Sequence, residues 1–311
     1  MPDNSSRPLL AVGLRCLGTA LVATMFMLAK LLGQRGVAVT ESIFWLLFIT
    51  VPALIAWLGS RGQLQRLATT RIKGYLVRTA VGLASTAFGF VAAKLLHLAE
   101  FTTLTFTAPL FAVVIAAVIL REHVGPWRWG AVICGFLGVL VIARPDGAPI
   151  SLVGAACGLL SGLTTGVVSF QIRDLATTEQ PINAVFWYAA LGSLAMAVFL
   201  PFVSHRHDAG TWALLLLLGL VGLCGQLLLV AALRFGPVSS VIIMDTTQLL
   251  WAALYGRFIW NELPSPTLWL GAPMVILAAV VIAWREHRLS RLAAGAARAG
   301  FPAAPPAPGG G

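Results

Sequence analysis

Asp245 is the residue whose type and position most clearly indicate chemistry. It lies about seven residues into the apolar stretch 238–260, which is long enough to cross a membrane as one helix. A carboxylate inside a span costs roughly 3 kcal/mol and normally faces a partner or a wet cavity. Gln248 shares its helical face at i+3. We therefore predict a polar site that contacts a substrate or takes up a proton; the alternative is a structural contact with another helix.

Trp251, Gln226 and Thr105 are further candidates for a substrate path. Trp251 lies deep in the span of Asp245, and Gln226 lies beside closely spaced glycines. No Ser–His–Asp arrangement, HExxH spacing or nucleotide-binding loop stands out in the sequence. We predict no catalytic residue, no metal site and no cofactor, and therefore neither an enzyme nor a protein that hydrolyses ATP itself.

A ladder of four glycines marks one face of the apolar stretch 150–171. A spacing of four residues removes side chains from one helical face and lets a neighbouring backbone approach closely. We predict helix packing there, with a sliding surface for a moving helix as the alternative. The ladder consists of Gly154, Gly158, Gly162 and Gly166.

The composition places these residues in a membrane protein. Apolar residues make up 59% of the 311 residues and charged residues only 10%, whereas about a quarter of a soluble domain is charged. The four cysteines lie inside apolar stretches without a CxxC spacing, which favours packing over disulfides or zinc. The net charge of +10 comes from short loops, so membrane topology explains it better than nucleic-acid binding.

Hydropathy predicts an all-α membrane protein with ten transmembrane helices. No loop is long enough to hold a soluble domain, and residues 287–311 are expected to form a disordered cytoplasmic tail. The predicted spans are 9–32, 39–59, 76–96, 99–120, 127–144, 150–171, 181–203, 211–233, 238–260 and 267–285.

The Lys and Arg residues predict the orientation. With both termini inside, fifteen of the 21 basic residues lie on the inner side, as the positive-inside rule requires. We therefore predict an N-in/C-in topology. The remaining six lie outside: Lys30, Arg35, Lys94, Arg144, Arg206 and Arg257.

The chain is one module written twice. Residues 98–122, LAEFTTLTFTAPLFAVVIAAVILRE, align with 238–262, VSSVIIMDTTQLLWAALYGRFIWNE, and this matches Thr107 with Thr247. Each copy holds five spans, and an odd number makes the second copy enter the membrane from the opposite side. We predict two inverted five-helix repeats, 1–148 and 149–286. Such repeats are common in secondary transporters, with the substrate site near the midplane between them.

The duplicated module resembles the repeat of the drug/metabolite transporter superfamily, EamA type. Its signature is a Pro-containing span, then a Glu, then a Gly about eight residues later. The resemblance implies ten helices, a bacterial inner-membrane location and movement of small metabolites, but no particular substrate. Two departures stand out: Leu46 follows Phe44 and Trp45 where members often carry Arg, and Leu249 stands opposite Pro109.

Charges at span ends suggest a pair of gates. Lys94 and Glu262 lie at outer ends, and their repeat mates Arg234 and Glu122 lie at inner ends. Two such ion pairs could close the two faces in turn. The alternative is that Glu122 and Glu262 pair locally with Arg121 and Arg257, as exposed ion pairs worth about 0–1 kcal/mol. We expect the charges that flank the outer loops to reach the membrane interface, namely Lys30, Glu41, Lys94 and Glu100.

The predicted function is a secondary transporter that moves a small polar or amphipathic metabolite across the cytoplasmic membrane by alternating access. An amino acid, a vitamin, a nucleotide-type metabolite and a drug all fit that class. The expected partners are this substrate, the lipid bilayer and protons as a candidate coupling ion, without nucleic acid. One alternative is a membrane-embedded enzyme, which would need clustered catalytic polar residues at one face. The other is a structural membrane partner protein, against which the complete duplication argues.

Overall fold

The computed structural model describes residues 8–119, 121, 124–143, 151–235, 244–263 and 265–298, and every regular element in them is helical. The first half contains α1 (Pro8–Gln34), α2 (Val39–Gly59), η1 (Leu64–Leu67), α3 (Ile72–Leu95), α4 (Leu98–Thr105), α5 (Ala108–Val118) and α6 (Pro126–Ala143). The second half contains α7 (Leu152–Leu175), α8 (Pro181–Ala197), α9 (Leu200–Val203), α10 (Ala209–Phe235), η2 (Met244–Thr246), α12 (Thr247–Trp260) and α13 (Pro266–Arg298).

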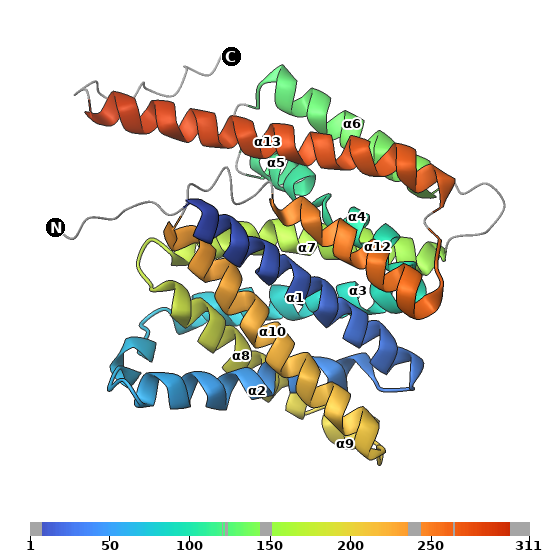
Figure 1. Cartoon of the computed structure of the whole chain (residues 1–311). Coiled ribbons are helices and arrows are strands. Elements are labelled where there is room, and N and C mark those ends of the chain that lie inside the picture. The colour runs from blue at the N-terminus through green and yellow to red at the C-terminus, as the bar shows by residue number, and fades with distance from the viewer. Residues whose placement is uncertain are drawn as a thin grey trace.

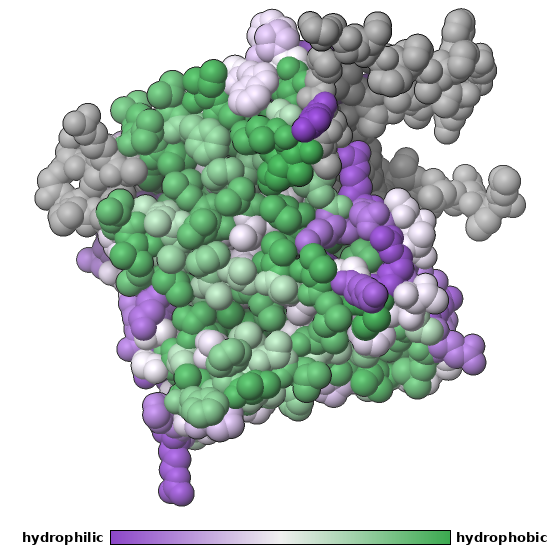
Figure 2. Space-filling model, turned by 180° about the vertical axis from the view of Figure 1, so that it is seen from behind, coloured by the Kyte–Doolittle hydropathy of each residue, from purple (hydrophilic) through white to green (hydrophobic). Residues whose placement is uncertain are grey.

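Length and apolar composition make this a multi-pass membrane protein. Within the described residues, seven helical segments can cross a membrane, and α6 and α8 are shorter apolar helices. Figure 2 shows a broad apolar lateral surface with polar side chains mostly at its margins. Such a surface suits contact with lipid and would be a liability in water. Each of the ten predicted stretches overlaps at least one observed helix, while ten crossings and the N-in/C-in orientation stay predictions.

The helix packing follows the duplication. Helix α1 packs against α10 as α7 packs against α3, and α2 packs against α10 as α8 packs against α3. Helix α12 lies on α1 as α5 lies on α7. The counterparts α6 and α13 pack on each other, as do α2 and α8 (Figure 1). This is the contact pattern that a pseudo-two-fold axis between the two copies produces.

The fourth stretch of the first copy is bent, and the bend has a cause in the sequence. Helix α4 ends at Thr105 and α5 begins at Ala108. Pro109 has no N–H to donate to the carbonyl four residues earlier, which interrupts the helix. The N–H groups of Phe106 and Thr107 donate instead to carbonyls three residues back, at 3.1 Å each.

The same threonine hydrogen bond closes a turn at corresponding positions of both copies. The hydroxyl of Thr107 donates to the carbonyl of Leu104 at 2.6 Å, and the hydroxyl of Thr247 donates to the carbonyl of Met244 at 2.6 Å. In the second copy the 3₁₀ turn η2 stands at the position of the first copy's bend, although Leu249 replaces the proline there. The turn with its threonine hydrogen bond is therefore a repeated feature that does not depend on proline alone.

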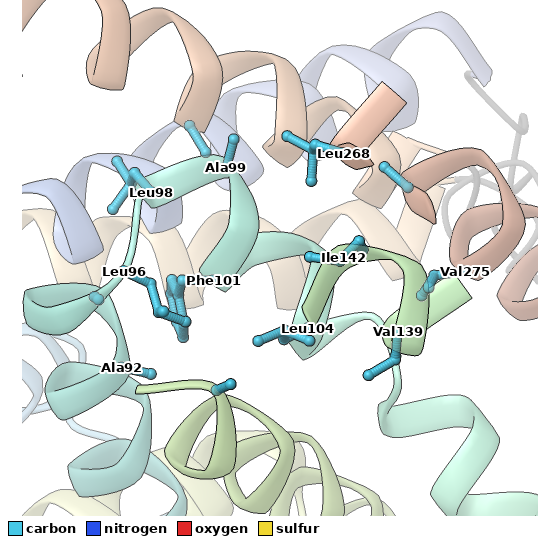
Figure 3. Close-up of a cluster of buried hydrophobic side chains, with 14 residues drawn as sticks. Ala92, Leu96, Leu98, Ala99, Phe101, Leu104, Val139, Ile142, Leu268 and Val275 are labelled. Atoms are coloured by element: carbon cyan, nitrogen blue, oxygen red, sulfur yellow. The ribbon is translucent and has the colours of Figure 1, made fainter. Parts of the chain in front are cut away.

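An apolar core holds the corner between α3 and α4. Figure 3 shows Leu96, Leu98 and Phe101 around this corner, close to side chains of α6 and α13. Its buried members include Ala92, Leu104, Val139, Ile142, Leu268 and Val275.

The C-terminal segment differs from its sequence-based prediction. Helix α13 continues to Arg298, so residues 287–298 are helical where a disordered tail was expected. The Ala-, Leu- and Arg-rich composition of this part favours helix. Residues 299–311 lie outside the described residues.

Candidate functional site

A cavity of about 470 Å³ lies between helices of both copies. Three charged side chains line it: Arg15 from α1, Arg78 from α3 and Asp245 from η2. Four of the predicted path residues are in its wall, namely Thr105, Gln226, Asp245 and Gln248. The apolar part of the wall includes Val22, Met25, Phe26, Leu46, Leu47, Phe106, Val185 and Leu223.

Trp251 lies away from this wall. It is half-buried on α12 and is not among the residues that line the cavity. Thr105 occupies the position in the first copy that corresponds to Asp245 in the second, at the bend of its own span. These two corresponding positions thus contribute a hydroxyl, from Thr105, and a carboxylate, from Asp245, to the wall of one cavity.

Asp245 is held by an arginine that the sequence analysis had used only for topology. The Nε and Nη2 atoms of Arg15 donate to the two carboxylate oxygens of Asp245 at 2.5 and 2.6 Å. Arg15 Nη1 also donates to the carbonyl of Leu229 at 3.2 Å. A two-pronged contact of this kind fixes both side chains. The ion pair joins α1 to η2, as the structural interpretation expects, and it also lines the cavity. A role for Asp245 in substrate or proton binding stays a prediction.

Arg78 is the second charged group that sequence reasoning missed. Its guanidinium carbon lies 4.5 Å from the centroid of the Tyr188 ring. The Tyr188 hydroxyl in turn shares a hydrogen bond with Thr86 at 2.8 Å. Because Arg15 and Asp245 neutralise each other, the charged side chains of the wall sum to one positive charge, on Arg78. A position seven residues inside its helix is the sequence signal that could have revealed Arg78.

Hydroxyl pairs connect the helices around the cavity. Thr19 on α1 and Thr247 on α12 share a hydrogen bond at 2.9 Å. Ser85 on α3 and Thr165 on α7 share one at 2.8 Å. Hydroxyls can donate and accept, so these pairs can reorient toward a bound polar group.

The far end of α1 carries a buried ion pair. The Lys30 ammonium donates to Glu262 and, at 2.8 Å, to the carbonyl of Leu96. Glu262 also accepts from the backbone N–H of Leu98 at 3.3 Å. We call these four groups the Lys30 latch. It joins α1, the end of α12 and the corner between α3 and α4.

The latch lies beyond the cavity along α1. Arg15 in the cavity wall and Lys30 in the latch are fifteen residues apart, which is about 22 Å along a helix. Between them the ring of Phe26 lies 4.7 Å from that of Phe101 and 5.9 Å from that of Phe90. We call these three rings the Phe26 plug. Phe26 belongs to the cavity wall, so the plug lies between the cavity and the latch.

The ion pair at this end differs from the predicted one. Glu262 pairs with Lys30, whereas Lys94 is exposed and the stem of its side chain lies beside Gly33. Lys30 approaches Glu262 because α1 packs on α12, a contact that sequence spacing does not give. The predicted mates fall outside the described structure: Glu122 lies in a gap, and the side chain of Arg234 is not described.

Three charges that were expected to reach the interface are buried instead. Besides Lys30, Glu41 accepts hydrogen bonds from Ser204 and His207 at 3.0 Å each. Glu100 is also buried, 3.2 Å from the imidazole of His97. Each charge stays inside because a partner from the loops or a neighbouring turn compensates it.

The glycine ladder of α7 packs against α4 and α5. A Cβ built on Gly162 would collide with the hydroxyl of Thr107, and one on Gly166 would lie 3.1 Å from the carbonyl of Ala108. Gly154 and Gly158 face leucine side chains at the end of α3 and on α4. The ladder therefore lets α7 approach the bend of the first copy.

A duplicated helical bundle with a cavity between its copies defines the class of a membrane transporter. The family model of the EamA-like transporter family matches residues 9–144 and again 152–284. This chain belongs to that family.

Curated relatives carry different transport names. A riboflavin transporter of Rhizobium johnstonii is 31% identical over 193 residues, which cover 60% of this chain and 62% of that protein. A pseudopaline exporter of Pseudomonas aeruginosa is 25% identical over 234 residues, 75% of this chain and 82% of the exporter. Human solute carrier family 35 member G1 is 25% identical over 301 residues, 86% of this chain and 78% of that protein. A transporter role is the common element.

A solved structure shares the fold. The similarity has a TM-score of 0.57 at 19% sequence identity and covers 92% of this chain and 98% of the other.

Proposed function

We propose that this protein is a secondary transporter that moves a small polar or amphipathic metabolite by alternating access. The carrying observation is a cavity between the two copies, with the Phe26 plug at its wall and the Lys30 latch beyond it. In this proposal the plug and the latch are the closed end: a substrate would bind in the cavity, the latch would open, and the other end would close. The matching packing of the two copies supports such an exchange of shapes.

The proposed substrate class follows from the wall. Most of its residues are apolar, and its charged groups are few and fixed. Such walls suit a ligand with an apolar body and a small number of polar groups. The relatives named for riboflavin and pseudopaline are consistent with an organic metabolite of this kind. Asp245 is the proposed proton site if transport is coupled to protons.

The proposed orientation places the cavity toward the cytoplasm of a bacterial cell and the latch toward the outside. Reporter fusions after Arg71 and after Arg288 should give cytoplasmic signals, and a fusion after Arg206 should give an external one. An external signal at Arg288 would overturn the N-in/C-in topology and with it the inverted arrangement of residues 1–148 and 149–286.

We keep the gate hypothesis but change the proposed partner of Glu262. We propose Lys30 and Glu262 as the outer gate in place of Lys94 and Glu262. The inner gate remains the proposed pair of Arg234 and Glu122. Disulfide trapping between paired cysteines at these two positions would test it, and failure to crosslink in any condition would exclude this inner pair.

The function is tested in two steps with purified full-length protein. A thermal-shift screen against amino acids, vitamins, nucleotide-type metabolites and drugs identifies compounds that stabilise the fold. Uptake of those compounds into proteoliposomes then tests transport with and without a proton gradient. We expect saturable uptake of at least one stabilising compound, and binding without any movement across the membrane would refute the transporter proposal.

A further inference from the structure

Arg78 is a buried cation without an anionic partner. The residue is 9% exposed, and its Nε and Nη1 atoms are buried without a hydrogen-bond partner. Its guanidinium carbon lies over the Tyr188 ring, 4.5 Å from the centroid. Burial of an uncompensated charge is costly. The fold nevertheless places this cost at the wall of the cavity.

The carboxylates of the described chain are committed elsewhere. Asp245, the one acidic residue among the described residues of the cavity wall, accepts hydrogen bonds from two nitrogen atoms of Arg15. Glu179 accepts from Thr69 at 2.7 Å and from Asn183 at 2.8 Å. No described acidic group comes within salt-bridge distance of Arg78, in contrast with Arg15 and Lys30.

The neighbourhood of Arg78 suits an amphipathic anion. A guanidinium can form two parallel bonds to a carboxylate or phosphate through its edge, and the Nε and Nη1 atoms of Arg78 have no other hydrogen-bond partner. Ser85 and Thr165 line the same cavity and offer hydroxyls to further oxygens. Leu47, Val185 and other apolar residues complete the wall.

We propose that Arg78 binds the anionic group of the transported substrate, so that the substrate is an amphipathic carboxylate or phosphate. This inference rests on the proposed transport function and names the substrate class of its cavity. The bound anion supplies the charge that Arg78 lacks in the empty protein. Arg15 and Asp245 stay paired and carry no part of that recognition.

The test uses matched probes and matched variants in thermal-shift measurements at constant ionic strength. Benzoate and phenyl phosphate are the anionic probes, and benzamide is the neutral probe of nearly the same shape as benzoate. Arg78→Met removes the charge, and Arg78→Lys keeps the charge without the planar fork. Arg61→Met is the control, because Arg61 also lies 4.5 Å from an aromatic ring, that of Trp57, but outside the cavity.

We expect benzoate or phenyl phosphate to raise the melting temperature of the unsubstituted protein more than benzamide does, and the stronger of the two identifies the group. Arg78→Met should weaken that binding about 10–100-fold, Arg78→Lys less, and Arg61→Met not at all. Without ligand, Arg78→Met should melt no lower than the unsubstituted protein, because it removes an uncompensated charge. The proposal is overturned if neither anion raises the melting temperature more than benzamide does, or if the anions stabilise Arg78→Met as much as the unsubstituted protein. It is also overturned if, without ligand, Arg78→Met and Arg78→Lys both melt markedly lower than Arg61→Met.

Transport assays in proteoliposomes distinguish failure of the anion site from failure of the proposed transport function. Anion binding through Arg78 without movement across proteoliposomes would refute transport and leave the binding site standing. Uptake restricted to neutral or cationic compounds, unchanged in Arg78→Met, would refute the anion site and leave transport standing.

Discussion

The Lys30 latch gives the sharpest test of how the closed end is held. The substitution Glu262→Gln keeps the shape of the side chain and removes its charge. Lys30 then keeps its bond to the Leu96 carbonyl but loses its counter-ion, while its side chain is 4% exposed. The closed state thereby loses stability relative to an open state in which Lys30 reaches water.

The size of the effect follows from burial. Removal of one partner of a buried ion pair typically costs about 3–5 kcal/mol. The Glu262 side chain is 15% exposed, so the lower end applies, about 3 kcal/mol. A change of that size alters the ratio of closed to open molecules by ~150-fold.

Cysteine labelling measures this ratio. Ala93 is fully buried beside the latch corner, and Ala93→Cys supplies the probe once the native cysteines are replaced, namely Cys16, Cys134, Cys157 and Cys224. With a membrane-impermeant maleimide we expect Glu262→Gln to raise the labelling rate on the order of 100-fold, in proportion to the open fraction.

An exposed ion pair provides the control. Arg71 and Asp174 are 2.6 Å apart, with side chains 35% and 64% exposed. Such pairs contribute about 0–1 kcal/mol, so Asp174→Asn should change the labelling rate about fivefold at most. The reasoning is refuted if Glu262→Gln labels like Asp174→Asn while both variants keep their melting temperatures.

Three further predictions concern separate parts of the chain. Asp245→Asn should fold but transport at least about tenfold more slowly, with altered pH dependence in proteoliposome uptake, because a charge-assisted bond is lost; normal uptake across pH would leave Asp245 a purely structural role. Gly162→Leu should lower the folded yield and cost about 1–3 kcal/mol or more, whereas Gly13→Leu, with open space around it, should not; equal yields would place the ladder face against lipid. Hydrogen bonds from Thr211 lower the pKa of Asp208 at the start of α10, so its stabilising contribution is present above the unfolded pKa and is lost as pH falls through the lowered folded value. The melting-temperature difference between the unsubstituted protein and Asp208→Ala should therefore be present at pH ~7 and vanish well below about pH 3, and a difference that persists in acid would show that the cap does not act through its charge.

Of the ion pair in the cavity wall, the sequence predicted Asp245 as a site residue but not Arg15. Asp245 stood out because a carboxylate is rare inside an apolar stretch. Arg15 and Arg78 were assigned to topology, because an arginine seven or eight residues into a helix also fits the positive-inside pattern. Arg15 and Arg78 lie about as deep in their helices as Asp245 lies in its apolar stretch, and this depth would have marked them as candidate site residues.

Partners across helices could not be predicted in the same way. Lys94 and Lys30 are both basic residues near outer span ends, and only the packing of α1 on α12 selects Lys30 for Glu262. The repeat itself was visible because it lies along the chain, as a fixed shift that any packing leaves unchanged. Glu41 shows the limit again, since His207 reaches it from a loop that hydropathy leaves unspecified.

The threonine-stabilised turns bear on the energetics of the proposed transport cycle. If the two copies exchange shapes, the two end states contain the same turns in exchanged places, at Thr107 and Thr247. Contributions common to the two copies then cancel in the free-energy difference between the end states, and only the positions where the copies differ remain. Pro109 opposite Leu249 is one such position. A difference of about 1.4 kcal/mol shifts the two populations tenfold, so a single residue at a bend is enough to set the resting state of the empty carrier.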